Sequence, residues 1–496
     1  NGKAAGPDGL ISVLFKNLGE VAIDSLVKSF NVLYDKVVYP EKWAESIIIP
    51  LYKKGDINNP NNYRGISLCS ITSKLYSSII NKRLSEWVEL NDITGEYQAG
   101  FKKNYSTIDH MFTLLAAVQK QFTKNRKLYV AFVDFEKAFD LISRKLLWPI
   151  LVKNGIRGKL YNCVKNMYED VKAKVRSGAK FSDFVRCTQG VKQGDICSPV
   201  LFSLFINELA LEIIEKGKHG VTFNLIELFI LLFADDIVLL SETVVGLQTQ
   251  LNSLFSAAQR LKLKVNMDKT NITVFRKGGY LAAGETWFYG NSRISVVNVY
   301  KYLGIYFSTK LSFTFACQDL VSRGKRAVIN VLNLLNKFEN TSARLFFRLF
   351  DAQVQPIVQY GAEIWAFETG QEIEKLHSFA IKRFLFVDRR TPNDMIYGEL
   401  GRFPIYLNSY LKCIKYWLKL VNMHEGRLPA QAYKTLYDLD CRGKVTWATK
   451  IRKCLESYGF SFVWNNQGVG CVETFLSCFK QRIIDSRWQE WDSHVQ

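Results

Sequence analysis

The sequence predicts an α+β core followed by a helical C-terminal third. Short apolar runs with strand character alternate with segments of helical spacing as far as about Phe307. Beyond that point, apolar residues recur at helical spacing, at Ala327, Val331, Leu334, Leu335 and Phe338. The length of 496 residues is too great for one small core and predicts two to four domains or subdomains.

The first expected elements lie before the middle of the chain. Residues 46–52 (SIIIPLY) predict a strand, in which Pro50 indicates a sheet edge or a bend. The turn residues of segment 58–62 (NNPNN) predict a loop, and residues 71–84 have helical spacing. A buried strand is expected at residues 128–135.

Two further elements complete the expected core. Ser198-Pro199 predicts a helix start, with Ser198 as the N-cap and an end near Lys216, before Gly217. Residues 228–240 predict two short strands around a turn at Asp235-Asp236.

Composition excludes two broad classes of protein. An aromatic content of 14% argues against a disordered chain. A membrane protein is not expected, because the most apolar run, residues 225–240, contains three acidic residues. There is no signal-peptide pattern. Because residue 1 is Asn, we expect the chain to be a fragment whose upstream part is missing.

The charge balance indicates a polyanionic partner. The chain carries 66 basic and 46 acidic residues, a net charge of +20, and residues 311–496 hold only +7 of it. A spread-out excess suits a protein that follows nucleic acid over a long path, although an ordinary basic protein has the same balance. The ten cysteines show no CxxC or zinc-finger spacing. We therefore expect reduced cysteines and a location in the nucleus and cytoplasm.

Three acidic residues lie where a charged side chain is costly. Asp134 follows the apolar residues 130–133, and Asp235 and Asp236 separate two apolar runs. Taken singly, Asp134 fits a strand end, and Asp235-Asp236 fits an exposed hairpin tip. Taken together, they fit a two-metal phosphoryl-transfer site, because Mg²⁺ prefers such oxygen ligands.

Several motifs in a fixed order carry a resemblance to a known family. Residues 233–236 (FADD) resemble the FADD box of reverse transcriptases, residues 132–140 (FVDFEKAFD) their first catalytic motif, and residues 189–207 the helix motif under template and incoming nucleotide. Their order and spacing resemble a non-LTR (LINE-type) retrotransposon reverse transcriptase. Similar segments lie at residues 2–10, 49–68, 99–109, 265–270, 300–305 and 360–365. The resemblance is dense to about residue 308 and weak beyond 395.

This resemblance implies a right-hand polymerase fold: fingers, a palm with an antiparallel sheet, and a helical thumb. We expect mainly fingers in residues 1–127, the palm with interleaved fingers helices in 128–308, the thumb or helical connection in 309–395, and a helical C-terminal extension in 396–496. The reverse transcriptase domain should cover about 45–308. The family also implies an endonuclease domain upstream of residue 1.

The implied reaction is addition of dNTPs to a primer 3′-hydroxyl on an RNA template. In a retrotransposon this would be target-primed synthesis, with a DNA primer supplied by nicked target DNA. The expected cofactor is two Mg²⁺ ions, with Mn²⁺ possible as a substitute. The implied metal-site residues are Asp134, Phe135, Asp235 and Asp236, and Lys269 joins the three acids as a catalytic residue.

Five residues are candidates for the nucleotide site. Arg64 and Lys53 flank the NNPNN loop and could reach over a triphosphate, although exposed surface charge is the simpler interpretation. The resemblance makes Phe139 a block against a ribose 2′-hydroxyl, where the residues alone fit a core Phe. It makes Gln193 and Gly194 nucleotide and template contacts, where the residues alone fit a plain turn.

The remaining candidates are basic. Lys269 lies in a segment (VNMDKT) that resembles the fourth family motif, so it is a candidate proton donor to pyrophosphate; an exposed loop lysine is the alternative. Arg323, Lys325 and Arg326 fall in the expected thumb and are candidates for duplex contact. A second cluster, residues 382–390, alternates basic and aromatic residues, and its role is open.

Two other functions fit parts of the sequence. A degenerate or co-opted copy could keep the fold and bind nucleic acid without catalysis, but the three acids and Lys269 are all present. A polymerase that copies RNA into RNA could share the fold, but Phe139 argues against it.

Overall fold

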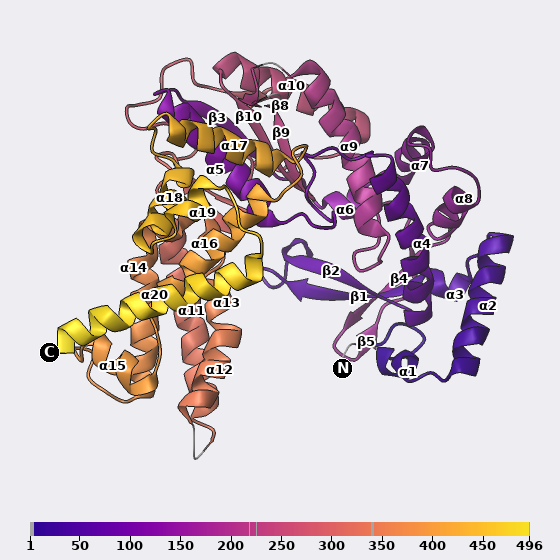
Figure 1. The fold of residues 1–496 in the computed structure, drawn as a ribbon. Helices are drawn as coiled ribbons and strands as arrows, with labels where there is room; N and C mark the ends of the chain where they lie inside the picture. Colours follow the sequence, from indigo (N-terminus) through magenta and orange to yellow (C-terminus); the bar gives the residue numbers. More distant parts are fainter. Residues whose placement is uncertain (1–3, 218, 225, 339–341, 496) are drawn as a thin grey trace.

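The computed structural model describes residues 4–217, 219–224, 226–338 and 342–495, and it has the mixed architecture that the sequence predicts (Figure 1). Within these residues, helices and strands alternate as far as β16 (Ile305–Ser308). From there on the regular elements are helices, from α11 (Thr314–Leu335) to α20 (Val472–Val495). The predicted α+β class with a helical C-terminal part is confirmed.

A sheet near the N-terminus is built on β1 (Glu45–Tyr52). It runs antiparallel to β2 (Tyr63–Cys69) and parallel to β4 (Lys172–Ser177). The pairing with β4 ends at Ile48, so Pro50 lies where β1 has a neighbour on one side only, as its missing N–H requires. The short strands β5 (Lys180–Phe181) and β6 (Val185–Arg186) complete this sheet.

The central sheet has the strand order β14-β11-β3-β10-β9. Its strands are β3 (Leu128–Val133), β9 (Ile230–Phe233), β10 (Asp236–Ser241), β11 (Asn271–Phe275) and β14 (Ser295–Val296). All of their pairings are antiparallel except that between β11 and β14. Segment 97–99 extends the sheet beyond β9, because Leu232 donates to Tyr97 O at 2.7 Å and accepts from Ala99 N at 2.9 Å.

Both faces of the central sheet are buried, which explains why its strands are nearly continuous apolar runs. On one face, Val130 and Phe132 pack with α5 (Thr107–Thr123). On the other, Ala131 and Val133 pack with α9 (Ser198–Lys216) and α10 (Val244–Leu261).

The C-terminal helices share the core of the α5 face. α17 (Leu428–Cys441) packs against α5, and α14 (Ala362–Phe384) lies beside both α11 and α16 (Tyr406–Val421). Apolar residues from β3 to α20 form one cluster. Figure 1 shows these helices gathered next to the central sheet, opposite the sheet of β1 and β2. The expected boundary at residue 395 falls inside α15 (Asn393–Leu400).

The other elements are helices and two-stranded hairpins. The helices are α1 (Ser12–Lys16), α2 (Glu20–Lys36), α3 (Glu41–Ala44), α4 (Ile71–Leu90), α6 (Ala138–Leu141), α7 (Arg144–Lys153), α8 (Gly158–Asn166), α12 (Ala343–Gln353), α13 (Gln355–Val358), α18 (Trp447–Ser457), α19 (Ser461–Asn465) and a 3₁₀ turn at Pro60–Asn62. The hairpins are β7 (Val221–Phe223) with β8 (Ile226–Leu228), β12 (Phe288–Tyr289) with β13 (Ser292–Arg293), and β15 (Val299–Tyr302) with β16.

Two local expectations need correction. The N-cap of α9 is Cys197, and Ser198 is already helical; its hydroxyl donates to Lys192 O at 2.8 Å instead of capping the helix. The helix expected at 71–84 continues to Leu90. In the part of the chain that the structure describes, no helix is long and apolar enough to cross a membrane.

Candidate active site

The three predicted acids lie together at one end of β3 and β10. Ile237 is paired with Val133, so the next residues outward, Asp236 and Asp134, stand at adjacent strand ends. Asp235 comes directly before Asp236, in the turn between β9 and β10. All three side chains are half-buried.

Burial and mutual repulsion act on this cluster. Burial, and then the charges of Asp235 and Asp134, raise the pKa of Asp236 to about 6. Burial also raises the pKa of Asp235, and Asp134 adds to that shift. Three carboxylates in one place are therefore an electrostatic cost that a cation would relieve.

Lys269 provides one positive charge at the site. Its Nζ lies 2.9 Å from Asp134 Oδ2, and its side chain remains 58% exposed. The segment before it is tied to β3, because Asn266 N donates to Asp134 O at 2.8 Å. The structure thus brings Lys269 to the acids, as a partner of Asp134.

The donor set fits a hard divalent cation. Carboxylate oxygens are the ligands that Mg²⁺ prefers, and Phe135, just beyond the end of β3, places a backbone carbonyl next to Asp134. Within the described ranges, no group of three or more Asp, Glu, His or Cys side chains is placed so as to hold a metal ion by itself. Mg²⁺ does not require one, because it usually takes one or two carboxylates and completes its shell with water and substrate phosphates.

The backbone of Gly100 packs closely against the turn that carries Asp235. Ala234 adopts a left-handed φ of +57° in this turn. A Cβ at Gly100 would overlap the backbone nitrogen of Ala234, so only glycine allows this approach. Nothing in the local sequence singles out Gly100, since its neighbour here is 134 positions away in the chain.

The predicted basic residues Arg64 and Lys53 lie on the β1–β2 hairpin, and both are exposed. The charge of Arg64 opposes the rise in the pKa of Asp235. Burial raises the pKa of Asp140, and the charges of Lys137, Arg64 and Lys53 oppose that rise. Asp140 is the third residue of α6, and Ser143 is the N-cap of α7.

Phe139, five residues after Asp134, is half-buried and belongs to an aromatic stack. Its ring stacks on Phe202 of α9 at 4.3 Å between centroids, and Phe101 meets its edge at 6.2 Å. Phe101 follows Gly100 directly, and its side chain is exposed. Phe101 is a neighbour that the sequence did not single out, because nothing local links it to Phe139.

Gln193 and Gly194 lie where the loop before α9 contacts β2. Gln193 O accepts from Ser67 N of β2 at 2.9 Å. Gly194 has a φ of +116°, and a Cβ there would lie 2.7 Å from Ser67 O. The close approach that the glycine permits is thus to the backbone of β2, which places this loop between the β1–β2 hairpin and α9.

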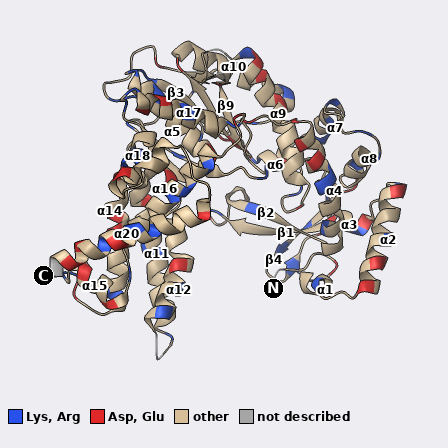
Figure 2. Cartoon of the chain, viewed as in Figure 1, with Lys and Arg blue, Asp and Glu red and all other residues tan. Residues whose placement is uncertain are grey.

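The three thumb candidates on α11 have different surroundings. Arg323 is paired with Asp319 at 3.0 Å, and Asp319 also binds Lys301. Lys325 lies over the ring of Phe379 at 5.6 Å. Arg326 is exposed. Figure 2 shows basic residues over both the β1–β2 side and the helical side of the molecule.

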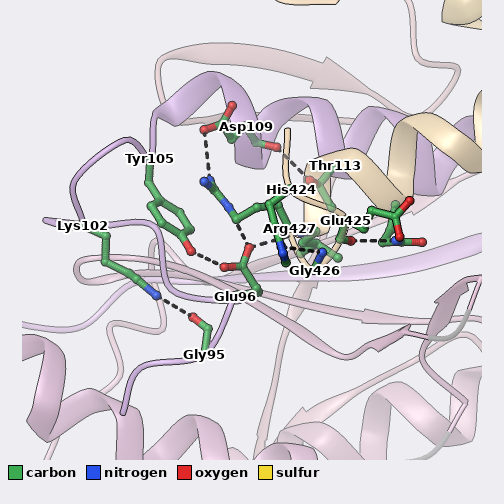
Figure 3. Close-up of polar contacts among 12 residues, drawn as sticks. Gly95, Glu96, Lys102, Tyr105, Asp109, Thr113, His424, Glu425, Gly426 and Arg427 are labelled. Atoms are coloured by element: carbon green, nitrogen blue, oxygen red, sulfur yellow. Dashed lines mark hydrogen bonds and ion pairs between the residues drawn. The ribbon is translucent and has the colours of Figure 1, made fainter. Parts of the chain in front are cut away.

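A polar junction ties the C-terminal helices to the loop beside the acids (Figure 3). Arg427, at the start of α17, donates through Nε to Glu96 at 3.0 Å and lies 3.9 Å from Asp109. Asp109 is 1% exposed and accepts from Lys419 and Tyr416 at 3.0 and 3.1 Å. The sequence missed this junction, because its partners lie more than 300 residues apart.

Residue 360 makes a similar link. Tyr360 Oη donates to Leu303 O of the β15–β16 turn at 2.8 Å, and it lies 3.1 Å from Thr107 Oγ1 at the start of α5. The segment 360–365, which resembles a family motif, therefore fixes the hairpin turn relative to α5.

Comparison with known proteins gives the family. Residues 52–307 match the family model described as "Reverse transcriptase (RNA-dependent DNA polymerase)". A probable RNA-directed DNA polymerase from transposon BS of Drosophila melanogaster is 27% identical over 374 residues, which is 73% of this chain and 40% of that protein. A Pol polyprotein from the type-1 retrotransposable element R2 of Popillia japonica is 26% identical over 73% of this chain and 50% of its own.

The chain thus spans about half or less of these curated relatives. Among solved structures, apo telomerase from Candida tropicalis is 12% identical, with a TM-score of 0.43, over 94% of this chain and 73% of its own. The family match covers more than half of the chain and contains all three acids, Phe139 and Lys269. The chain belongs to the reverse transcriptase (RNA-dependent DNA polymerase) family, and its relatives are the polymerases of non-LTR retrotransposons.

Proposed function

We propose that this chain carries the polymerase activity of a non-LTR retrotransposon and adds dNTPs to a primer 3′-hydroxyl on an RNA template. The convergence of Asp134, Asp235, Asp236 and Lys269 at one sheet edge carries this proposal. Two bound Mg²⁺ ions would lower the pKa of the attacking hydroxyl and stabilise the leaving pyrophosphate.

The residues of the chain supply position and charge. Asp134 and Asp235 are the residues that would hold the ions, with Asp236 beside them. Lys269 has three N–H donors on a flexible stem, so it can leave Asp134 and give a proton to pyrophosphate. Arg64 and Lys53, opposite the acids on the β1–β2 hairpin, are the proposed triphosphate contacts.

Sugar choice is assigned to Phe139. Its ring is fixed from behind by Phe202. A rigid ring beside the 2′-carbon leaves no room for a hydroxyl, which favours dNTPs and disfavours the rival reaction that copies RNA into RNA.

The wider setting is part of the same proposal. Target-primed synthesis would use nicked target DNA as the primer, with an endonuclease domain upstream of this chain. All ten cysteines are free, which agrees with reducing compartments such as the nucleus and cytoplasm.

Primer extension with Mg²⁺ and dNTPs on an RNA template tests the reaction. Asp134→Asn and Asp235→Asn should each abolish extension without a large loss of melting temperature, because each removes one charge from a cluster of three carboxylates. A matched control is Asp183→Asn on the exposed loop before β6, which should extend normally. Extension by either active-site variant at the wild-type rate would reject the assignment. No extension by the wild-type chain would favour a co-opted nucleic-acid-binding protein.

A further inference from the structure

A basic groove lies on the helical part of the molecule, between the second half of α11 and the end of α14. Two adjoining hollows of about 620 and 720 Å³ share the side chains of Phe379, Lys382 and Arg383. Lys325, Phe386 and Arg389 complete what we call the α11–α14 groove. Figure 1 shows α14 leading from the central sheet towards α15, so the groove lies at the end of α14 remote from the acids.

The charge of the groove is one-sided. Its lining holds five basic side chains and one acidic residue, Asp388. Lys375 is paired with Glu372. In the residues that the structure describes, Lys325, Lys382, Arg383 and Arg389 have no ion-pair partner. Unpaired cations held close together repel one another, and a chain of phosphates would relieve that repulsion.

The aromatic residues of the groove occupy two levels. Phe379 lies at the base, with Lys325 Nζ 5.6 Å and the guanidinium carbon of Arg383 5.9 Å from its ring centre. Phe386 is 92% exposed in the turn after α14. This turn is closed by hydrogen bonds from Val387 N to Lys382 O at 3.2 Å and from Lys382 Nζ to Arg389 O at 3.0 Å. The chain therefore holds an apolar ring in solvent, among cations.

An exposed ring beside cations matches a nucleic acid whose bases are unpaired. In a duplex the base faces are already stacked, so Phe386 would gain nothing from them. In a single strand, a base can stack on Phe386 while neighbouring phosphates contact Arg383 and Arg389. We propose that the α11–α14 groove binds single-stranded RNA outside the catalytic cleft. The choice of RNA rests on the proposed function, since the template is the long single strand that such an enzyme handles.

Binding of a fluorescent U12 RNA to the full chain, measured by anisotropy against salt, tests the groove. Arg383→Ala/Arg389→Ala should lower the slope of log K against log salt by about 1.4, which is about 0.7 for each phosphate that the variant no longer neutralises. Phe386→Ala should weaken binding about five-fold or more without changing the slope. The matched controls are Arg126→Ala/Arg442→Ala, two exposed arginines elsewhere, and Tyr280→Ala, whose ring is 96% exposed.

A U12 strand with 4-thiouridine locates the bound RNA, because cross-links should fall in residues 379–389 and disappear in the groove variants. Slopes and affinities equal to those of the controls would overturn the proposal. Tighter binding of dT12 or of a blunt duplex, lost in the same groove variants, would also overturn the proposal. Extension of a short annealed primer should be unchanged in the groove variants. If the wild-type chain extends no primer but U12 binding still depends on Phe386, the groove stands and the proposed function falls.

Discussion

Arg427 lies over the ring of Tyr105, with its guanidinium carbon 3.6 Å from the centre of the ring. The two residues belong to the start of α17 and to the loop before α5, and Glu96 contacts both side chains. The same loop begins with segment 97–100, which pairs with β9 and supports the turn of Asp235. The last third of the chain therefore holds a loop that shapes the acidic site.

This stacking predicts a double effect of Arg427→Ala. The melting temperature should fall, by an amount equivalent to about 1–3 kcal/mol, since Glu96 loses its ion pair with Arg427 and Asp109 keeps only that with Lys419. The KM for dNTP should rise as the loop beside Phe101 loosens. Arg427→Lys should restore part of the stability. It should not restore the stacking on Tyr105 or the separate guanidinium contacts to Glu96 and Asp109. The control is Arg442→Ala, an exposed arginine at the C-terminal end of α17. An unchanged KM would limit Arg427 to stability.

The raised pKa of Asp236 predicts how stability depends on pH without metal. The pKa is about 6 in the folded chain against an ordinary 3.8, so the folded state binds more protons between these values. Stability should therefore fall as pH rises from about 4 to 6, and the loss should persist above 6.

Thermal melts in chelator check this dependence. At pH 7, Asp236→Asn should be more stable than the wild type by at most roughly 3 kcal/mol, and near pH 4 the two should agree. Added Mg²⁺ should raise the melting temperature of the wild type more than that of the variant. An equal difference at both pH values would remove Asp236 as the cause.

The stack of Phe139 on Phe202 predicts the result of opening the sugar pocket. Phe139→Val should raise incorporation of NTPs relative to dNTPs by about ten-fold or more, because it frees the space of a ring beside the 2′-carbon. Phe202→Leu, behind the ring, is the control and should change selectivity less. An unchanged ratio in single-nucleotide incorporation would leave Phe139 as a packing residue.

The pair of Lys269 with Asp134 predicts different effects for two substitutions. Lys269→Leu should slow single-turnover incorporation by ~10²-fold if the lysine donates a proton. Lys269→Arg should keep the charge but transfer the proton poorly, because guanidinium holds it too tightly. Neither change should alter stability much, since the lysine side chain is mostly exposed to solvent. Wild-type rates for both variants would contradict the role.

The surroundings of the α11 cations predict unequal roles in duplex binding. Arg326→Ala should lower the salt slope for a primer–template duplex by about 0.9, the value for one neutralised phosphate. Arg323→Ala should change it less, because Asp319 already holds that guanidinium. Equal slopes for Arg326→Ala and the wild type would place the duplex elsewhere.

Local patterns were sufficient for most of the fold. The strand expected at 128–135 ends at Val133, and the two strands expected at 228–240 lie at Ile230–Phe233 and Asp236–Ser241. The helix expected to end near Lys216 does end there. These elements follow from apolar runs bounded by turn residues. The acids were recognisable because carboxylates inside apolar strands are costly. The N-cap of α9 was misplaced because Ser198 satisfies its hydroxyl with Lys192 O and not with its own helix.

What the sequence could not supply depends on residues that are far apart along the chain. Gly100 and Ala234, Phe101 and Phe139, and Arg427 and Tyr105 meet only in the folded chain. Their local sequence gives no periodic signal, since each pair is set by how loops and helices pack. The ion pair of Arg323 was also not predicted, although Asp319 lies four residues away on its own helix, because spacing alone does not show which exposed charges meet.

The position of α5 between the central sheet and α17 also bears on how the molecule unfolds. Detaching the C-terminal helices would remove the cover of α5 and expose one face of the central sheet to water. The C-terminal helices and the central sheet should therefore melt as one cooperative unit. Helices α9 and α10 belong to the second core and cover the opposite face. Hydrogen exchange should therefore give amides in β3, α5 and α17 a common opening free energy, while α2 and the β1–β2 hairpin open earlier.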